Sequence, residues 1–157
     1  MPVSLDVAVL VGSPRDLEKL QPLEEVFQRY GIRYWMKVAS AHRSPQKVVA
    51  LVQKAEEEGA GLLVAAAGLA AYLPGVVASR TVLPVIGLPL AAGSLGGLDA
   101  LLSVVQMPRG VPVATVAIDQ AVNAALLAAE ILSLRNPSLK EKLLAERRLW
   151  EEEGAKG

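Results

Sequence analysis

The sequence predicts an α/β fold of three layers, in which a parallel sheet of about five strands lies between helices. Short apolar runs alternate with helical stretches, and turn residues separate the two. The chain is 52% hydrophobic but only 4% aromatic, and an apolar content of mostly Ala, Val and Leu is typical of strands buried on both faces. We therefore expect one α/β domain over residues 1–157, with its core at about 5–134.

The five strands are expected at 5–11, 32–39, 62–67, 84–88 and 111–118, and helical stretches follow each of them. Ser13-Pro14 and Ser44-Pro45 predict two helix starts, with serine as the N-cap and proline in the first turn. Asp16 stands three residues after Ser13, as in a capping box. Later helices are expected from Leu98 to Gln106 and from Asn123 to Leu134.

A last helix is expected at about 138–153, with Ser138 as its cap, after the break at Asn136-Pro137. It carries an apolar stripe on an otherwise charged surface. Because the stripe follows a proline break, we expect this helix to pack on a neighbouring subunit. The stripe is formed by Leu139, Leu143, Leu144 and Trp150.

Composition excludes several classes of function. Sixteen basic residues balance sixteen acidic ones, whereas broad nucleic-acid binding requires a basic excess. The absence of cysteine excludes a disulfide or a thiolate nucleophile. No apolar run is long enough for a membrane span, and Asp6 interrupts the first one, so we expect no signal peptide and a cytoplasmic location.

Four loops, at 12–16, 40–45, 68–75 and 89–97, follow the carboxyl ends of expected strands. In open parallel sheets ligands bind at this edge. Ser13 and the amides at a helix start can bind a phosphate, and Asp16 can accept hydrogen bonds from ribose hydroxyls. The same two residues are also ordinary helix caps, so the first loop taken alone leaves both interpretations open.

The second loop, Ser40 to Pro45, holds the only histidine in the chain. Arg43 and the following helix N-terminus both disfavour imidazolium, which leaves His42 available as a base near neutral pH. Arg43 offers a two-pronged donor for a phosphate. A lone histidine and its neighbouring arginine are more often simply exposed, and one histidine without cysteine does not predict a metal site.

A series of motifs, in order over about 7–134, resembles the N5-carboxyaminoimidazole ribonucleotide mutases, within the bacterial-type aminoimidazole ribonucleotide carboxylase family of purine biosynthesis. No single motif is specific, but the series is. It consists of Gly12-Ser13 with Asp16, Ser40 to Pro45, Ala70 to Gly75, Gly97-Leu98-Asp99, Ser103 to Pro108 and Asn123 to Ala129.

The resemblance implies a flavodoxin-like sheet and a homo-octamer whose active sites lie at subunit contacts. It implies transfer of a carboxylate from the exocyclic nitrogen of a phosphorylated ribonucleotide to ring carbon C4, with no cofactor and no metal. His42 matches the general acid–base residue. The matching substrate-binding positions are Ser13, Asp16, Ser40, Arg43, Gly68, Leu69 and Tyr72.

This chain departs from the family pattern in three loops. Leu69 stands where a second glycine is usual, Tyr72 where a histidine is usual, and Ala91-Ala92 where Gln-Ser is common. The loop before Asn123 is also about two residues shorter than usual. A direct CO2-dependent carboxylase and a non-catalytic module that binds nucleoside monophosphates therefore remain alternatives.

Overall fold

The computed structural model describes residues 4–156. Its five strands are β1 (Val7–Val11), β2 (Tyr34–Val38), β3 (Leu62–Gly68), β4 (Val85–Leu90) and β5 (Ala114–Thr115). All pairings are parallel, and the strand order is β2-β1-β3-β4-β5. The chain runs outward from β1 to β2 and then returns to β3 on the other side of β1, so the topological switch point lies between β1 and β3. The predicted three-layer fold with a parallel sheet of five strands is confirmed.

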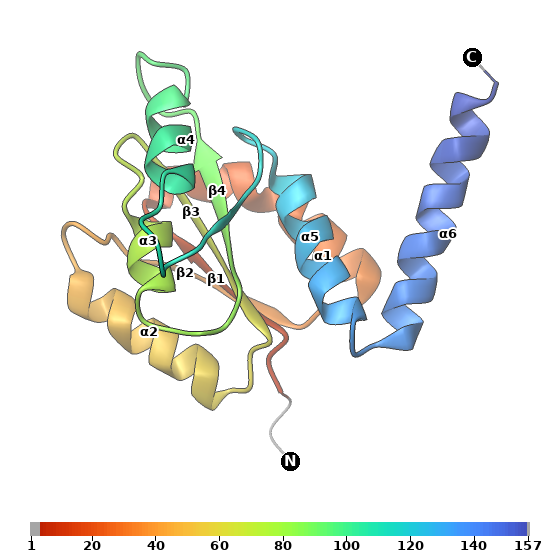
Figure 1. The fold of residues 1–157 in the computed structure, drawn as a ribbon, viewed down its shortest axis with the longest axis horizontal. Coiled ribbons are helices and arrows are strands. Elements are labelled where there is room, and N and C mark those ends of the chain that lie inside the picture. The colour runs from red at the N-terminus through yellow and green to blue at the C-terminus, as the bar shows by residue number, and fades with distance from the viewer. Residues whose placement is uncertain (1–3, 157) are drawn as a thin grey trace.

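Helices cover both faces of this sheet (Figure 1). The helices α1 (Gln21–Tyr30) and α5 (Ala121–Ser133) lie on one face. On the other lie α2 (Pro45–Glu57), α3 (Leu73–Ala78) and α4 (Leu98–Val105). A 3₁₀ helix, η1 (Pro14–Leu20), precedes α1, and α6 (Pro137–Gly154) ends the described chain.

The alternation of side chains along β1 divides the core in two. Val7, Val9 and Val11 belong to the apolar cluster under α1 and α5, whereas Ala8 and Leu10 belong to the cluster under α2, α3 and α4. All five are completely buried, as expected for a strand covered on both faces. The continuous apolar run in the sequence therefore reflects burial on both sides, and it leaves only the strand ends to carry polar groups.

The first predicted helix differs from the structure. The helix expected to start at Ser13-Pro14 is a 3₁₀ helix as far as Leu20 and an α-helix only from Gln21. Pro22 stands in the first turn of α1, where its missing N–H is tolerated. Gly31 ends α1 with a φ of 69°, a conformation that suits glycine.

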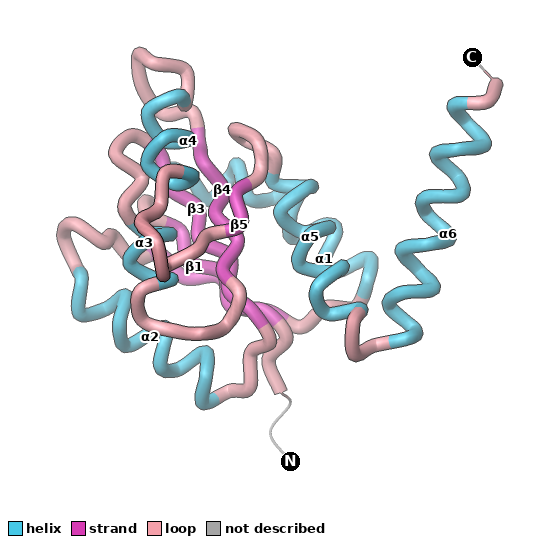
Figure 2. Tube along the Cα trace, viewed as in Figure 1, coloured by secondary structure: helices cyan, strands magenta, loops and turns pink. Residues whose placement is uncertain are grey.

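Three other expected boundaries also differ. Figure 2 shows that most of the expected strand at 111–118 is loop, and only Ala114–Thr115 pairs with β4. The helix expected to start at Asn123 begins at Ala121. Asn136, not Ser138, caps α6, and its side chain accepts a hydrogen bond from the amide of Leu139 at 3.1 Å.

The final helix α6 extends away from the body of the molecule (Figure 1). Only the start of its apolar stripe is covered: Leu139 is buried and Leu143 packs against the core. Leu144 and Trp150 are exposed. Two ion pairs with α1 and α5 help to hold it, Arg29–Glu146 at 2.9 Å and Glu130–Arg147 at 2.6 Å.

Candidate active site

A cavity of about 590 Å³ lies at the carboxyl ends of the strands. The loops that follow β1, β2, β3 and β4 all contribute to its lining, which is the position that the parallel topology predicts. The structure brings all eight residues predicted to be catalytic or substrate-binding into this one cavity. These are Ser13, Asp16, Ser40, His42, Arg43, Gly68, Leu69 and Tyr72.

The first loop places a carboxylate in the cavity wall. Ser13 caps η1, and its hydroxyl oxygen accepts a hydrogen bond from the amide of Arg15 at 3.4 Å. Asp16 does not complete the expected capping box: no donor among the described residues reaches its carboxylate. Asp16 is nevertheless only 8% exposed. A buried carboxylate that faces a cavity without a donor can accept hydrogen bonds from a ligand that carries hydroxyl groups.

Burial also changes the acidity of Asp16. Loss of solvation raises the pKa of its carboxyl above the ordinary value of 3.8, and the nearby Asp119 adds to this. The positive charges of Lys19 and Arg15 act in the opposite direction. The surroundings of Asp16 therefore disfavour its charged form, unless a ligand supplies hydrogen-bond donors to the carboxylate.

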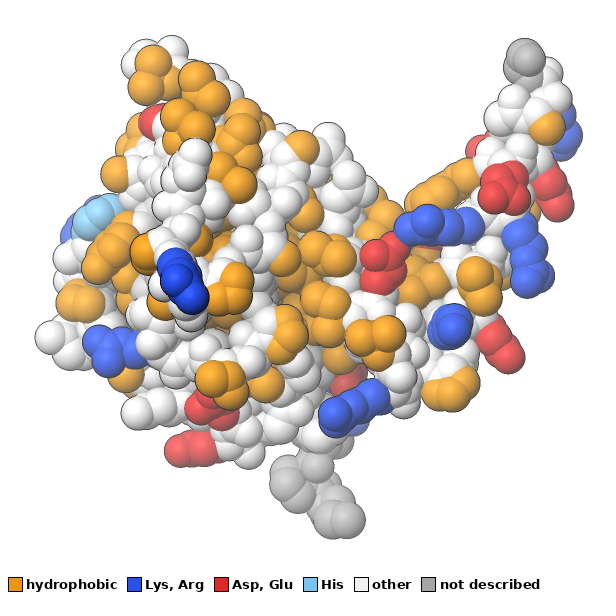
Figure 3. Space-filling view, viewed as in Figure 1, with side chains coloured by type: hydrophobic (Ala, Val, Ile, Leu, Met, Phe, Trp, Pro, Cys, Tyr) orange, Lys and Arg blue, Asp and Glu red, His pale blue; other side chains and the backbone are white. Residues whose placement is uncertain are grey.

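The second loop is a tight turn that presents His42 and Arg43 to the cavity. The amide of Ser44 donates to the carbonyl of Ser40 at 2.8 Å. The hydroxyl oxygen of Ser40 accepts from the backbone amide of Arg43 at 3.2 Å and from its Nε at 3.4 Å. The small buried side chain of Ala41 anchors the turn, whereas His42 and Arg43 are exposed. His42 is the pale blue side chain at the surface in Figure 3. Ser40 therefore contacts both the backbone and the guanidinium group of Arg43.

The third loop shows why small residues follow β3. A side chain at Gly68 would place its Cβ 2.6 Å from the Cβ of Ala92 and 3.1 Å from the carbonyl oxygen of Leu90. Leu69 adopts a left-handed conformation with a φ of 56°, which costs a non-glycine residue about 1 kcal/mol. Tyr72 lies against His42, with a distance of 5.2 Å between ring centroids and 31° between ring planes.

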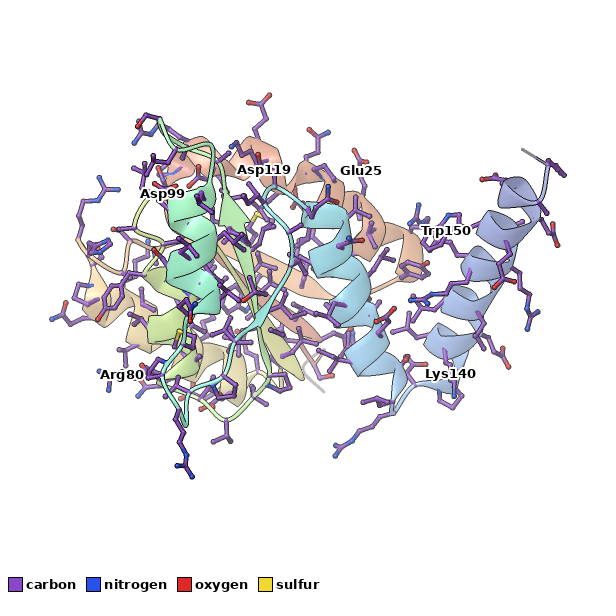
Figure 4. All side chains as sticks on the ribbon, turned by 45° about the horizontal axis from the view of Figure 1, so that its top comes forward. Glu25, Arg80, Asp99, Asp119, Lys140 and Trp150 are labelled. Atoms are coloured by element: carbon purple, nitrogen blue, oxygen red, sulfur yellow. The ribbon has the colours of Figure 1, made fainter. Side chains whose placement is uncertain are left out.

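Two functional candidates escaped the sequence analysis, Lys19 and Asp119. Lys19 lines the cavity, donates to the carbonyl oxygen of Ala91 and lies 3.4 Å from Asp119. The same Asp119 oxygen accepts from the amide of Ala91 at 3.0 Å, and Asp119 has a φ of 59°. Figure 4 shows Asp119 in the loop that precedes α5. Lys19 and Asp119 are 100 residues apart and belong to no motif, so no signal in a single sequence could have paired them.

Two negative findings hold for residues 4–156. No three His, Asp or Glu side chains lie close enough together to hold a metal ion. None of the helices combines the length and the apolar character that crossing a membrane requires.

Comparisons of the sequence with family models and with curated proteins point to the same family. The family model described as AIR carboxylase matches residues 6–153. The N5-carboxyaminoimidazole ribonucleotide mutase of Pyrococcus horikoshii is 50% identical over 137 residues, which cover 87% of this chain and 77% of that protein. The protein of the same name from Saccharolobus solfataricus is also 50% identical, over 87% of each chain.

The solved structures agree. The crystal structure of Treponema denticola PurE has a TM-score of 0.88 and 27% sequence identity, covering 96% of this chain and 94% of that one. Together with the match to the family model over nearly the whole sequence, this shows that the chain belongs to the AIR carboxylase family.

Proposed function

We propose that this chain is an intramolecular carboxylate-transferring mutase, an isomerase of de novo purine biosynthesis. It converts N5-carboxyaminoimidazole ribonucleotide to 4-carboxy-5-aminoimidazole ribonucleotide. The observation that carries the proposal is one cavity in which three groups meet: a cluster of cations, a buried carboxylate and the imidazole of His42. The curated relatives named for this reaction, at 50% identity, support the same conclusion.

The cations bind the phosphate of the ribonucleotide, and the carboxylate binds its ribose. Arg43, positioned by Ser40, donates to the phosphate together with the hydroxyl of Ser13. Asp16 accepts hydrogen bonds from the ribose hydroxyls, which supply the donors that its carboxylate lacks. The base binds beside Gly68 and Leu69, which line the same cavity.

His42 is the group that moves a proton. The bond between the exocyclic nitrogen and the carboxylate carbon breaks, CO2 is released, and protonated His42 gives its proton to that nitrogen. C4 of the imidazole ring then attacks the CO2, and the neutral His42 removes the proton that C4 carries. The net change is the exchange of a carboxylate and a proton between N and C4, so neither an oxidant nor ATP is consumed, and no cofactor is required.

This route requires that CO2 remain beside the ring, which a cover over the cavity would ensure. In the single chain, His42 and Tyr72 are exposed. Exposed apolar side chains on α4 and α6 offer further surface to other copies of the chain. We therefore propose a homo-octamer in the cytoplasm, built from single-domain chains, in which α6 packs on a neighbouring subunit and the subunits close one another's cavities.

Replacement of His42 by Asn tests the proposal. Loss of a general acid–base group lowers turnover about 100- to 10,000-fold, while the dissociation constant of the product ribonucleotide stays within a few-fold. Gln46→Asn is the matched control, since Gln46 is exposed just beyond the loop and does not line the cavity. Unchanged turnover in His42→Asn would refute the role of His42.

A second assay separates the mutase from a direct carboxylase. The wild-type protein is supplied either with the N-carboxylated ribonucleotide or with aminoimidazole ribonucleotide and bicarbonate. The mutase consumes the first without added bicarbonate. Conversion of only the second would overturn the proposed function.

A further inference from the structure

Tyr72 is an exposed aromatic residue whose ring faces the only histidine in the chain. Its side chain is 55% exposed, so it contributes little to the core. Its ring centroid lies 5.2 Å from that of His42, and the two planes are inclined by 31°. This is a tilted aromatic contact within the usual range of separations. It joins the loop after β2 to the loop after β3 across the mouth of the cavity.

The position of the Tyr72 ring is set by a well-anchored backbone. The amide of Tyr72 donates to the carbonyl of Ala70 at 2.7 Å, and its own carbonyl accepts from the amide of Val76 at 3.1 Å. The residues on either side, Ala71 and Leu73, are buried. The backbone at Tyr72 is therefore fixed, and the ring projects from it as a short rigid arm.

The imidazole of His42, in contrast, has little else to orient it. Within residues 4–156, no hydrogen bond joins its ring nitrogens to another group. It stands on an exposed turn, where a side chain samples several rotamers unless something restricts it. The ring of Tyr72 is the one aromatic group in contact with the imidazole in residues 4–156, and both rings line the cavity.

We propose that Tyr72 is a positioning residue for His42. The contact selects the imidazole orientation that delivers a proton to the reacting ring, and it requires the aromatic ring of Tyr72 but not its hydroxyl. This inference rests on the proposed function, because it assigns Tyr72 a role through the acid–base group. An aromatic contact of ordinary strength shifts the population of the productive orientation by about 2- to 10-fold, which sets the size of the expected effect.

Steady-state kinetics of three full-length proteins test this role: the wild type, Tyr72→Ala and Tyr72→Phe. We expect Tyr72→Ala to lower kcat about 2- to 10-fold with KM nearly unchanged, and Tyr72→Phe to restore most of that loss. A rise in KM without a change in kcat would show a direct contact with substrate and overturn the proposal. Equal losses in the Ala and Phe variants would assign the effect to the hydroxyl and would also overturn it.

A second readout does not depend on turnover. Because His42 is the only histidine, ¹⁵N-histidine labelling gives the signals of a single imidazole, free of overlap with other rings. We expect its ring proton shifts to change in Tyr72→Ala and to stay near the wild-type values in Tyr72→Phe. Identical shifts in all three proteins would refute the contact. Failure of the wild type to turn over the N-carboxylated substrate would instead refute the proposed function, and the imidazole signals would still decide whether the rings of Tyr72 and His42 are in contact.

Discussion

Replacement of Asp16 by Asn should make the protein more stable and a poorer ligand binder. Asp16 is 8% exposed and accepts no hydrogen bond from the described residues. Burial raises the pKa of its carboxyl above 3.8, so the folded state binds this proton more tightly than the unfolded chain does. The charged form of Asp16 therefore lowers the free energy of unfolding at neutral pH. Asn has nearly the same size and removes that charge.

The pH dependence gives the sign of the stability effect. Below the unfolded pKa of about 3.8 the carboxyl is protonated in both states, and the charge penalty is absent. As the pH rises through the folded pKa, the wild type loses stability that Asp16→Asn keeps. Urea denaturation at pH 7 and at pH 3.5 should therefore show a stability advantage for the variant that is larger at pH 7.

The effect on binding follows from the hydrogen bonds that Asp16 is placed to accept. A hydrogen bond to a charged group contributes about 1.5–3 kcal/mol, which corresponds to about 10- to 150-fold in affinity. Titration calorimetry with the product ribonucleotide should show a loss in that range for Asp16→Asn. If the variant is less stable than the wild type at pH 7, or if it binds the ribonucleotide equally well, the assignment of Asp16 as a buried, donor-seeking carboxylate is wrong.

Two further predictions concern backbone conformation. Asp119→Gly and Asp119→Ala both lose the hydrogen bond from the amide of Ala91, but only the alanine variant carries the cost of the left-handed φ of 59°. In urea unfolding the glycine variant should therefore be more stable than the alanine variant by about 1 kcal/mol. Equal unfolding midpoints for the two variants would contradict this. Asn136→Ala should cost about 1 kcal/mol, because it removes the cap of α6, whereas Asn136→Asp keeps an acceptor and should cost less.

The sequence was most informative where periodicity and topology act together. The apolar run at Val7–Val11 indicated a strand covered on both faces, and the succession of strands and helices indicated that the loops after them share one edge. Those two inferences were enough to bring Ser13, His42 and Tyr72 into one cavity. Parallel strands that lie side by side must place their carboxyl ends together, so proximity did not depend on knowing any side-chain position.

Local details that depend on tertiary contacts were missed. The sequence around Pro14–Leu20 has the caps of an α-helix, but the segment is a 3₁₀ helix whose acidic residue turns into the cavity instead of back to the cap. The pairing of Lys19 with Asp119 depends on how two distant loops approach Ala91. Residues 111–118 have a strand-like pattern, but only Ala114 and Thr115, which form β5, pair with β4.

Substitutions in the two apolar clusters and substitutions in the loops around the cavity have different consequences for the fold. The strands and helices supply nearly all the buried apolar residues, while Leu69, Tyr72 and Ala92 lie in the loops at the cavity. Substitutions at these three loop positions leave the sheet and the helices that cover it intact. A substitution at one of these three positions can therefore change what the cavity accepts without requiring compensating substitutions in the core.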